Sequence, residues 1–197
     1  MNFIGCFEYL SDQELITAAK GGSDTCFGEL VDRHTTTAYR VARSITGSHE
    51  EAEDVVQESF LRAFKNLDRF DGSKSTFKTW LLTITRNQSI NIVSSFRRRA
   101  LKFFSDHEEG EPELEFASNP LSQEPLDAET QLSLKRQYHT MDKALKKLPE
   151  RQRTALLLRS QESLSYDEIA TVMDISVSSV ESLIFRARKK IIELVER

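Results

Sequence analysis

The chain has 197 residues, of which 39% are hydrophobic and 29% charged, with seven glycines and four prolines. This length suits one or two domains, and the scarcity of glycine and proline favours helices over a turn-rich β fold. Cys6 and Cys26 lie in neither a CxxC motif nor a Cys/His cluster, which argues against a zinc site or a disulfide framework. The sequence leaves open whether either thiol senses oxidation. Because no apolar run could span a membrane and the start lacks a basic leader, we expect a cytoplasmic protein.

The net charge of −4 conceals a strong segregation of charge along the chain. Residues 1–95 carry a net charge of −3, and residues 96–104 carry +4. Residues 105–133 contain nine acidic residues and no lysine or arginine, whereas residues 134–197 carry +4. The local basic segments keep nucleic acid a candidate partner although the total is acidic.

Two helices are predicted before residue 48. Ser11-Asp-Gln-Glu14 is a capping box, in which the serine oxygen accepts a free backbone N–H and the glutamate reaches back to the cap. The short helix that it opens ends at Gly21 and Gly22. Apolar residues at three- and four-residue steps then predict a longer helix from about Phe27 to Gly47.

Two further helices are predicted between residue 48 and the first basic run. Ser48-His-Glu-Glu51 is a second capping box and opens a helix to about Leu67. The segment 71–73 breaks the pattern, and a fourth helix runs from about Ser75 to beyond Val93. Each of these helices carries an apolar stripe, so the four can share a core.

The segment 105–127 differs in composition from the rest of the chain, because it is acidic, contains three prolines and shows little periodicity. Such a composition predicts a mobile linker. We therefore predict an all-α fold with two small helical domains, residues 8–100 and 130–197, joined by an acidic flexible linker at 101–129.

The strongest local signal is a helix-turn-helix at residues 164–190. Another helix is predicted before it, because Pro149 fits the first turn of a helix. A third capping box, Ser165-Tyr-Asp-Glu168, opens a short helix, and three residues separate that helix from a last one beginning at Val177. The second helix carries serines at its start and Arg186 to Lys190 near its end, which suits groove atoms and phosphates. The alternative is a plain helical hairpin with a solvated basic end.

Aromatic, amide and arginine side chains gather on and after the fourth helix: Phe77, Trp80, Asn87, Asn91, Phe96 and Arg97 to Arg99. Rings can stack on unpaired bases, amides can bind base edges, and arginines can hold the backbone of single-stranded DNA. The alternative is that Phe77 and Trp80 are ordinary core residues and that the arginines are merely solvated.

An acidic and amide face is predicted on the third helix. Asp54, Gln57 and Glu58 are spaced i, i+3 and i+4, so they share one side of the helix. This spacing is typical of a polar docking patch for a basic partner, and a solvated face is the alternative. No histidine accompanies these acids at ligand spacing, so we predict neither a metal site nor a cofactor.

Together these features resemble the extracytoplasmic-function (ECF) sigma factors, the minimal sigma-70-type group. Residues 51–65 are similar to region 2.2, which docks on the clamp coiled coil of the polymerase β′ subunit. The resemblance implies polymerase contacts at Asp54, Gln57, Glu58, Phe60 and Arg62.

Residues 70–91 are similar to regions 2.3 and 2.4, which melt and bind the −10 promoter element. The loop from Phe70 to Thr76 would receive a flipped-out base. The contacts implied for the −10 single strand are Phe70, Ser75, Thr76, Phe77, Trp80, Asn87, Asn91, Arg97 and Arg98.

Residues 148–153 resemble region 4.1, and the helix-turn-helix resembles region 4.2, which binds the −35 element. The implied contacts are Ser178, Ser179, Glu181, Ser182, Phe185, Arg186, Arg188 and Lys189. Many relatives carry a basic residue where this chain has Glu181. A carboxylate there could accept from cytosine N4, but it would repel a phosphate, so the resemblance does not give a promoter sequence.

The resemblance implies an RNA polymerase sigma factor rather than an enzyme. Its implied partners are core polymerase (β′ clamp and β flap), promoter DNA and an anti-sigma factor, without membrane insertion. One rival hypothesis is a stand-alone helix-turn-helix regulator, which leaves the face around Asp54 without a purpose. A second rival is a metal-dependent enzyme that uses the acidic helix.

Overall fold

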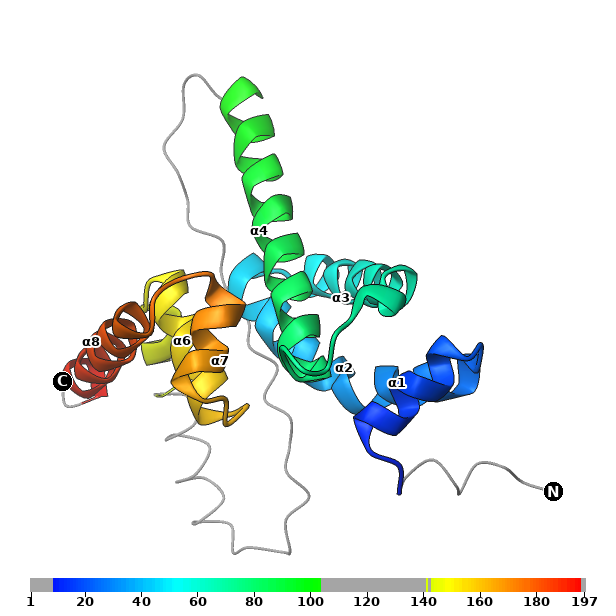
Figure 1. The fold of residues 1–197 in the computed structure, drawn as a ribbon. Coiled ribbons are helices and arrows are strands. Elements are labelled where there is room, and N and C mark those ends of the chain that lie inside the picture. The colour runs from blue at the N-terminus through cyan, green and yellow to red at the C-terminus, as the bar shows by residue number, and fades with distance from the viewer. Residues whose placement is uncertain (1–8, 104–140, 142, 196–197) are drawn as a thin grey trace, which may run out of the picture.

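The computed structural model describes residues 9–103, 141 and 143–195, with only the backbone described at 96–103. The described part is helical and contains no strand (Figure 1). Its helices are α1 (Asp12–Lys20), α2 (Asp24–Thr46), α3 (His49–Lys65), the 3-10 turn η2 (Leu67–Arg69), α4 (Phe77–Phe103), α6 (Glu150–Ser160), α7 (Tyr166–Met173) and α8 (Val177–Val195). The predicted all-α fold is confirmed, and most of the predicted linker lies outside the described residues.

The predicted helix starts agree closely with the observed ones. Ser11 and Ser165 each cap a helix and complete a capping box with the glutamate three residues later. Ser48 makes only one of the two hydrogen bonds of a capping box. Its Oγ accepts from the Glu51 amide, but the Glu51 side chain makes no bond back to the Ser48 amide. Pro149 occupies the cap position just before α6 rather than its first turn.

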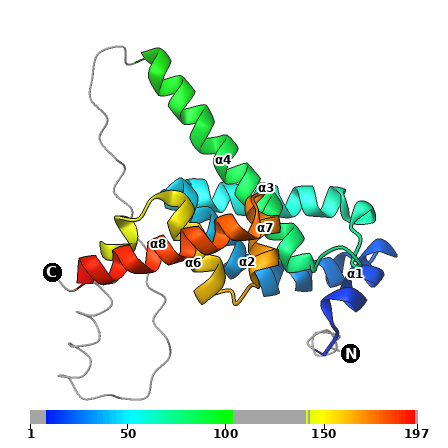
Figure 2. The same cartoon turned by 60° about the vertical axis from the view of Figure 1, so that its left-hand side comes forward.

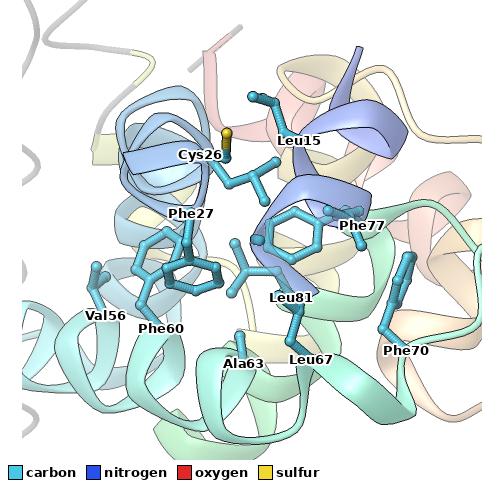
Figure 3. Close-up of a cluster of buried hydrophobic side chains, with 14 of the residues drawn as sticks. Leu15, Cys26, Phe27, Val56, Phe60, Ala63, Leu67, Phe70, Phe77 and Leu81 are labelled. Carbon is cyan, nitrogen blue, oxygen red and sulfur yellow. The ribbon is translucent and has the colours of Figure 1, made fainter. Parts of the chain in front are cut away.

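The first four helices enclose one hydrophobic core. Leu15 of α1, Leu30 of α2, Val55 of α3 and Leu81 of α4 are each fully buried. Figure 3 shows Phe27, Phe60 and Leu81 among the side chains that meet in this core. The predicted four-helix grouping follows from apolar stripes that recur at helical spacing on every one of these elements.

A second core crosses from these helices to the C-terminal ones. Val41 of α2 and Leu82 of α4 are fully buried in a cluster with Leu158 of α6, Ile169 of α7 and Ile184 of α8. Helix α7 lies beside α4 in both views, and Figure 1 shows it on the side of α4 away from α3 (Figures 1 and 2). The C-terminal helices are therefore docked on the N-terminal bundle, an arrangement that the sequence analysis did not predict.

The helix-turn-helix has the predicted form. Ile169, Met173, Val180 and Ile184 are buried where α7 and α8 meet. Asp174 closes α7 with a left-handed backbone at φ 52°, which gives the sharp turn between the two helices. Helix α8 is therefore held in place by its packing against α6 and α7.

We expect Ser165→Ala to destabilise the helix-turn-helix by about 1 kcal/mol, because α7 is only eight residues long and loses its cap. Thermal melting followed by circular dichroism would measure the shift. Ser160→Ala is the matched control, since the Ser160 hydroxyl only donates to a carbonyl within its own helix and should change the melting temperature little. Equal shifts in the two variants would contradict the capping role.

Candidate nucleic-acid and partner interfaces

One side of α3 is exposed and chemically mixed. Asp54, Gln57 and Glu58 are all exposed, as their helical spacing predicts. Leu61 and Phe64, 53% and 46% exposed, continue the same side of the helix one and two turns further on. We call these five residues the α3 face. It combines carboxylates and an amide with unusually accessible apolar side chains, which is typical of a protein-binding surface.

The other two predicted polymerase contacts, Phe60 and Arg62, differ in their exposure. The Phe60 side chain is only 6% exposed and packs in the N-terminal core, so the structure corrects its prediction as a surface contact. Arg62 is exposed, and its Nε donates to Glu58 Oε1 at 2.6 Å, so it also fixes the orientation of a predicted contact.

Sequence reasoning missed the apolar half of the α3 face. It gave neither Leu61 nor Phe64 a role in binding. Phe64 contacts Phe27 edge-on, with ring centroids 4.9 Å apart, yet keeps nearly half of its surface exposed. The available signal was the position of Leu61, four residues after Gln57 and seven after Asp54.

The aromatic residues before and within α4 form one cluster. The Phe70 ring lies 5.1 Å from Trp80 and 6.0 Å from Phe77. Phe70 and Phe77 are 6% and 2% exposed, whereas Trp80 is partly exposed. Phe77 is therefore a core residue in this conformation, as the alternative interpretation held for Phe77 and Trp80, whereas Trp80 keeps an accessible part. Phe70 is buried as well, so the structure corrects the prediction of Phe70 and Phe77 as accessible contacts to single-stranded DNA.

The loop between η2 and α4 is largely exposed, and hydrogen bonds hold its first residues. The Asp71 carboxylate accepts from the Ser73 amide and hydroxyl at 3.0 and 2.7 Å, and these bonds hold its pKa below the ordinary value. Lys20 of α1 donates to the Phe70 carbonyl at 2.8 Å. Ser75 is partly exposed and Thr76 is exposed, so both predicted loop contacts are accessible.

The predicted amide contacts lie on the outer side of α4. Asn87 and Asn91 are exposed and fall seven and eleven residues after Trp80, which places all three on one side of the helix. The structure therefore brings an accessible ring and two amides together. The side chains of Arg97 and Arg98 lie outside the described residues.

Helix α8 presents all of its predicted DNA contacts to the outside. Every one of them is exposed: Ser178, Ser179, Glu181, Ser182, Phe185, Arg186, Arg188 and Lys189. Phe185, at 70% exposure, is an uncommonly accessible aromatic side chain, and it suits apolar contact with a thymine methyl group. Ser176 caps this helix, because its Oγ accepts from the Ser179 amide. The arrangement fits a recognition helix in a major groove.

Polar contacts accompany the docking of the two halves. The Arg153 guanidinium donates to the Ser44 carbonyl at 2.7 and 3.0 Å. Glu162, between α6 and α7, accepts from side chains of α2 and α4. Arg86 is 6% exposed at this seam, and its Nε has no hydrogen-bond partner among the described residues.

Neither a metal centre nor a membrane span is found in the described part of the chain. Over the described residues, no group of three or more histidine, cysteine, aspartate or glutamate side chains is placed to hold a metal ion. No helix there is long and apolar enough to cross a bilayer. Cys26 is a buried free thiol that accepts from the Ser23 hydroxyl, and Cys6 lies outside the described residues.

Comparison with known families matches both halves of the chain. The family described as sigma-70 region 2 matches residues 30–101, and the family described as sigma-70, region 4 matches residues 138–191. The chain is 36% identical to an ECF RNA polymerase sigma-E factor of Salmonella typhimurium, over 93% of this chain and 94% of the relative. It is 33% identical to the RNA polymerase sigma-H factor of Pseudomonas aeruginosa, over 91% of each.

Solved structures have the same fold. The sigma factor RpoE of Bartonella quintana, in complex with the anti-sigma factor NepR, has a TM-score of 0.64 and 27% identity, covering 86% of this chain and 96% of that one. CnrH, in complex with the cytosolic domain of CnrY, has a TM-score of 0.61 and 29% identity, covering 94% and 97%. With a region 2 bundle, a region 4 helix-turn-helix and identity along nearly its whole length, the chain belongs to the ECF group of RNA polymerase sigma factors.

Proposed function

We propose that the α3 face attaches this sigma factor to the β′ clamp of core RNA polymerase, while α4 and α8 bind the −10 and −35 promoter elements. The observation that carries the proposal is the pairing of two exposed surfaces within one chain. The acidic, amide and apolar α3 face suits a protein partner. The serine- and arginine-bearing outer side of α8 suits duplex DNA.

At the −10 element, Trp80, Asn87 and Asn91 contact unpaired bases of the melted strand. Their shared exposed side of α4 supports this role, because a ring can stack on a base and amides can bind its edge. The exposed loop up to Thr76 receives one flipped base. The buried rings of Phe70 and Phe77 contact the Trp80 ring, with centroids 5.1 and 5.9 Å away, and so help to hold it in place.

At the −35 element, α8 enters the major groove. Arg186 and Arg188 neutralise phosphates or donate to guanine, and Phe185 contacts a thymine methyl group. Replacing Arg186 and Arg188 by glutamine is expected to weaken promoter binding by the holoenzyme about 10-fold to 100-fold and to reduce its salt dependence. An electrophoretic mobility shift with promoter DNA would measure this, and unchanged binding would contradict the role of α8.

The docked arrangement cannot engage both elements together. The two elements lie about 25 base pairs apart, or roughly 85 Å at about 3.4 Å per base pair. Helix α8 packs on α7, and α7 packs on α4, so two helix-packing distances of about 10 Å each separate the DNA-binding helices. Core polymerase therefore separates the two domains, and the tethered contacts then act together.

An anti-sigma factor restrains this protein in the same way as NepR partners the Bartonella quintana relative. The protein acts in the cytoplasm, where polymerase is, and its role is non-catalytic. The domains are residues 8–100 for polymerase and −10 binding and 130–197 for −35 binding, with 101–129 between them.

Runoff transcription tests the function directly. Core polymerase of Escherichia coli, the source of a 35% identical sigma factor, would be mixed with this protein and genomic fragments of its host. Specific transcripts are expected only when both proteins are present. A strong gel shift by the free chain, without any stimulation of polymerase, would instead favour a stand-alone regulator.

A further inference from the structure

The Glu162 carboxylate occupies a pocket whose donors all come from the other domain. It accepts from the Thr37 hydroxyl at 2.8 Å, from Arg40 Nη1 at 3.3 Å and from Lys78 Nζ at 3.0 Å. The Glu162 side chain is only 4% exposed. Two of these donors lie on α2 and the third on α4, so the N-terminal bundle by itself supplies the whole binding shell.

The pocket is built for an anion. Burial alone would raise the pKa of Glu162, but the bonds from Lys78, Thr37 and Arg40 and the charge of Lys78 outweigh burial and lower it. The carboxylate is therefore held in its ionised form. Lys78 Nζ also donates to the Glu162 backbone carbonyl at 2.9 Å, which fixes the lysine within the pocket. The two cations and the hydroxyl that surround this carboxylate would suit a phosphate equally well.

Charge at the docked seam is unbalanced. Among the described residues, Glu162 is the one buried carboxylate, whereas two arginines at the seam, Arg86 of α4 and Arg153 of α6, are buried. Burial lowers the pKa of Arg86 and Arg153, because it disfavours their cationic forms. Once the C-terminal domain leaves, Glu162 and Arg153 leave with it, whereas Arg40 and Lys78 remain on α2 and α4 together with the buried Arg86. That surface then attracts negative charge.

The pocket lies beside the start of α4, where the proposed −10 loop ends. Lys78 is two residues after Thr76, the last residue of that loop. A second carboxylate of the C-terminal domain, Glu168, accepts from the Thr79 hydroxyl at 3.2 Å. Both carboxylates thus approach the positive end of the α4 dipole, where anions are favoured.

Resting on the proposed −10 function, we propose that Thr37, Arg40 and Lys78 bind a backbone phosphate of the melted promoter strand, and that Glu162 fills this phosphate pocket in the docked state. The ligand is a phosphodiester of single-stranded DNA next to the base held by the loop. Docking of the C-terminal domain and binding of this phosphate exclude each other, because both need the same three donors.

The first test uses the free full-length chain and a fluorescein-labelled 30-nucleotide single strand of random sequence. Fluorescence anisotropy would give affinities over a series of salt concentrations. Glu162→Gln is expected to bind this DNA about 5-fold more tightly than the unaltered chain, because the pocket loses its competing carboxylate. Adding Lys78→Gln to that variant should remove the gain and lower the salt slope by about 0.7, the value for one phosphate on a single strand.

The effect of Lys78→Gln in the Glu162→Gln background tells whether Lys78 binds phosphate or only holds the two domains together. If Lys78 only held the domains together, the double variant would bind DNA at least as tightly as Glu162→Gln alone, and the proposal would be overturned. Lys147→Gln in the Glu162→Gln background is the charge-matched control, since Lys147 is exposed on the other domain. Arg40→Gln repeats the test from α2, should Lys78→Gln fail to fold.

The second test uses the holoenzyme on the same DNA, with the domains already separated by polymerase. Here Lys78→Gln should bind about 5-fold more weakly, whereas Glu162→Gln should match the unaltered holoenzyme. If the unaltered chain does not bind core polymerase at all, both the proposed function and the phosphate-pocket proposal are refuted. If the holoenzyme forms and binds DNA but Lys78→Gln behaves like Lys147→Gln, only the pocket proposal fails.

Discussion

Replacing Asp54, Gln57 and Glu58 together by alanine is expected to weaken binding to core RNA polymerase by at least about 100-fold. A few central residues carry most of the energy of a protein interface, and a 100-fold loss needs only about 1 kcal/mol from each of the three. All three are exposed, so alanine opens no cavity in the core, and alanine favours the helix. Titration of labelled core polymerase would measure the affinity, and circular dichroism would verify the fold.

The control carries the same change in charge elsewhere. Asp32→Ala together with Asp167→Ala removes two exposed carboxylates from α2 and α7, away from the α3 face. This variant should bind core polymerase like the unaltered chain. A second comparison, Leu61→Ala with Phe64→Ala, should weaken binding about 10-fold if the apolar half of the face is also covered. Unchanged affinity in the triple variant would refute the polymerase-binding role of the α3 face.

The local features of the fold were predictable because their causes are local. A capping box needs two residues three positions apart, and both Ser11 and Ser165 form theirs as predicted. The side shared by Asp54, Gln57 and Glu58 likewise follows from helical spacing alone. The helix-turn-helix depends on one cap, one tight turn and two short apolar stripes, all within 27 consecutive residues of the sequence.

The apolar periodicity of the sequence predicts which side chains are buried, but it does not predict which other helix each of them packs against. Leu81 and Leu82 are neighbours and both fully buried, yet one packs in the N-terminal core and the other in the seam between domains. Phe60 and Phe64 share one apolar stripe, but only Phe60 is buried. Glu162 pairs with Thr37 across 125 positions of sequence, for which no local pattern exists. The docked seam therefore emerged only from the structure.

Leu82→Ala is expected to release the C-terminal domain from the bundle. Leu82 is fully buried with Val41 and with side chains of α6 to α8, and truncation of such a leucine costs about 2–5 kcal/mol. Much of that loss falls on the docked contact, because among the described apolar side chains of α4 Leu82 is the one fully buried in the seam, whereas Ile90 and Val93 are only partly buried against it. Small-angle X-ray scattering should show a larger radius of gyration, since the domains then remain joined only through residues 104–140.

Leu81→Ala is the matched control, because it removes the same atoms from the neighbouring position of the same helix. Its cavity would lie in the N-terminal core, so it should lower the melting temperature of the bundle without enlarging the folded protein at low temperature. Leu82→Ala should also raise affinity for single-stranded DNA, as Glu162→Gln does, because both free the α2 and α4 side of the seam. Equal radii of gyration for the two leucine variants would mean that Leu82 does not hold the domains together, and the seam would then depend on its other apolar contacts and its polar contacts.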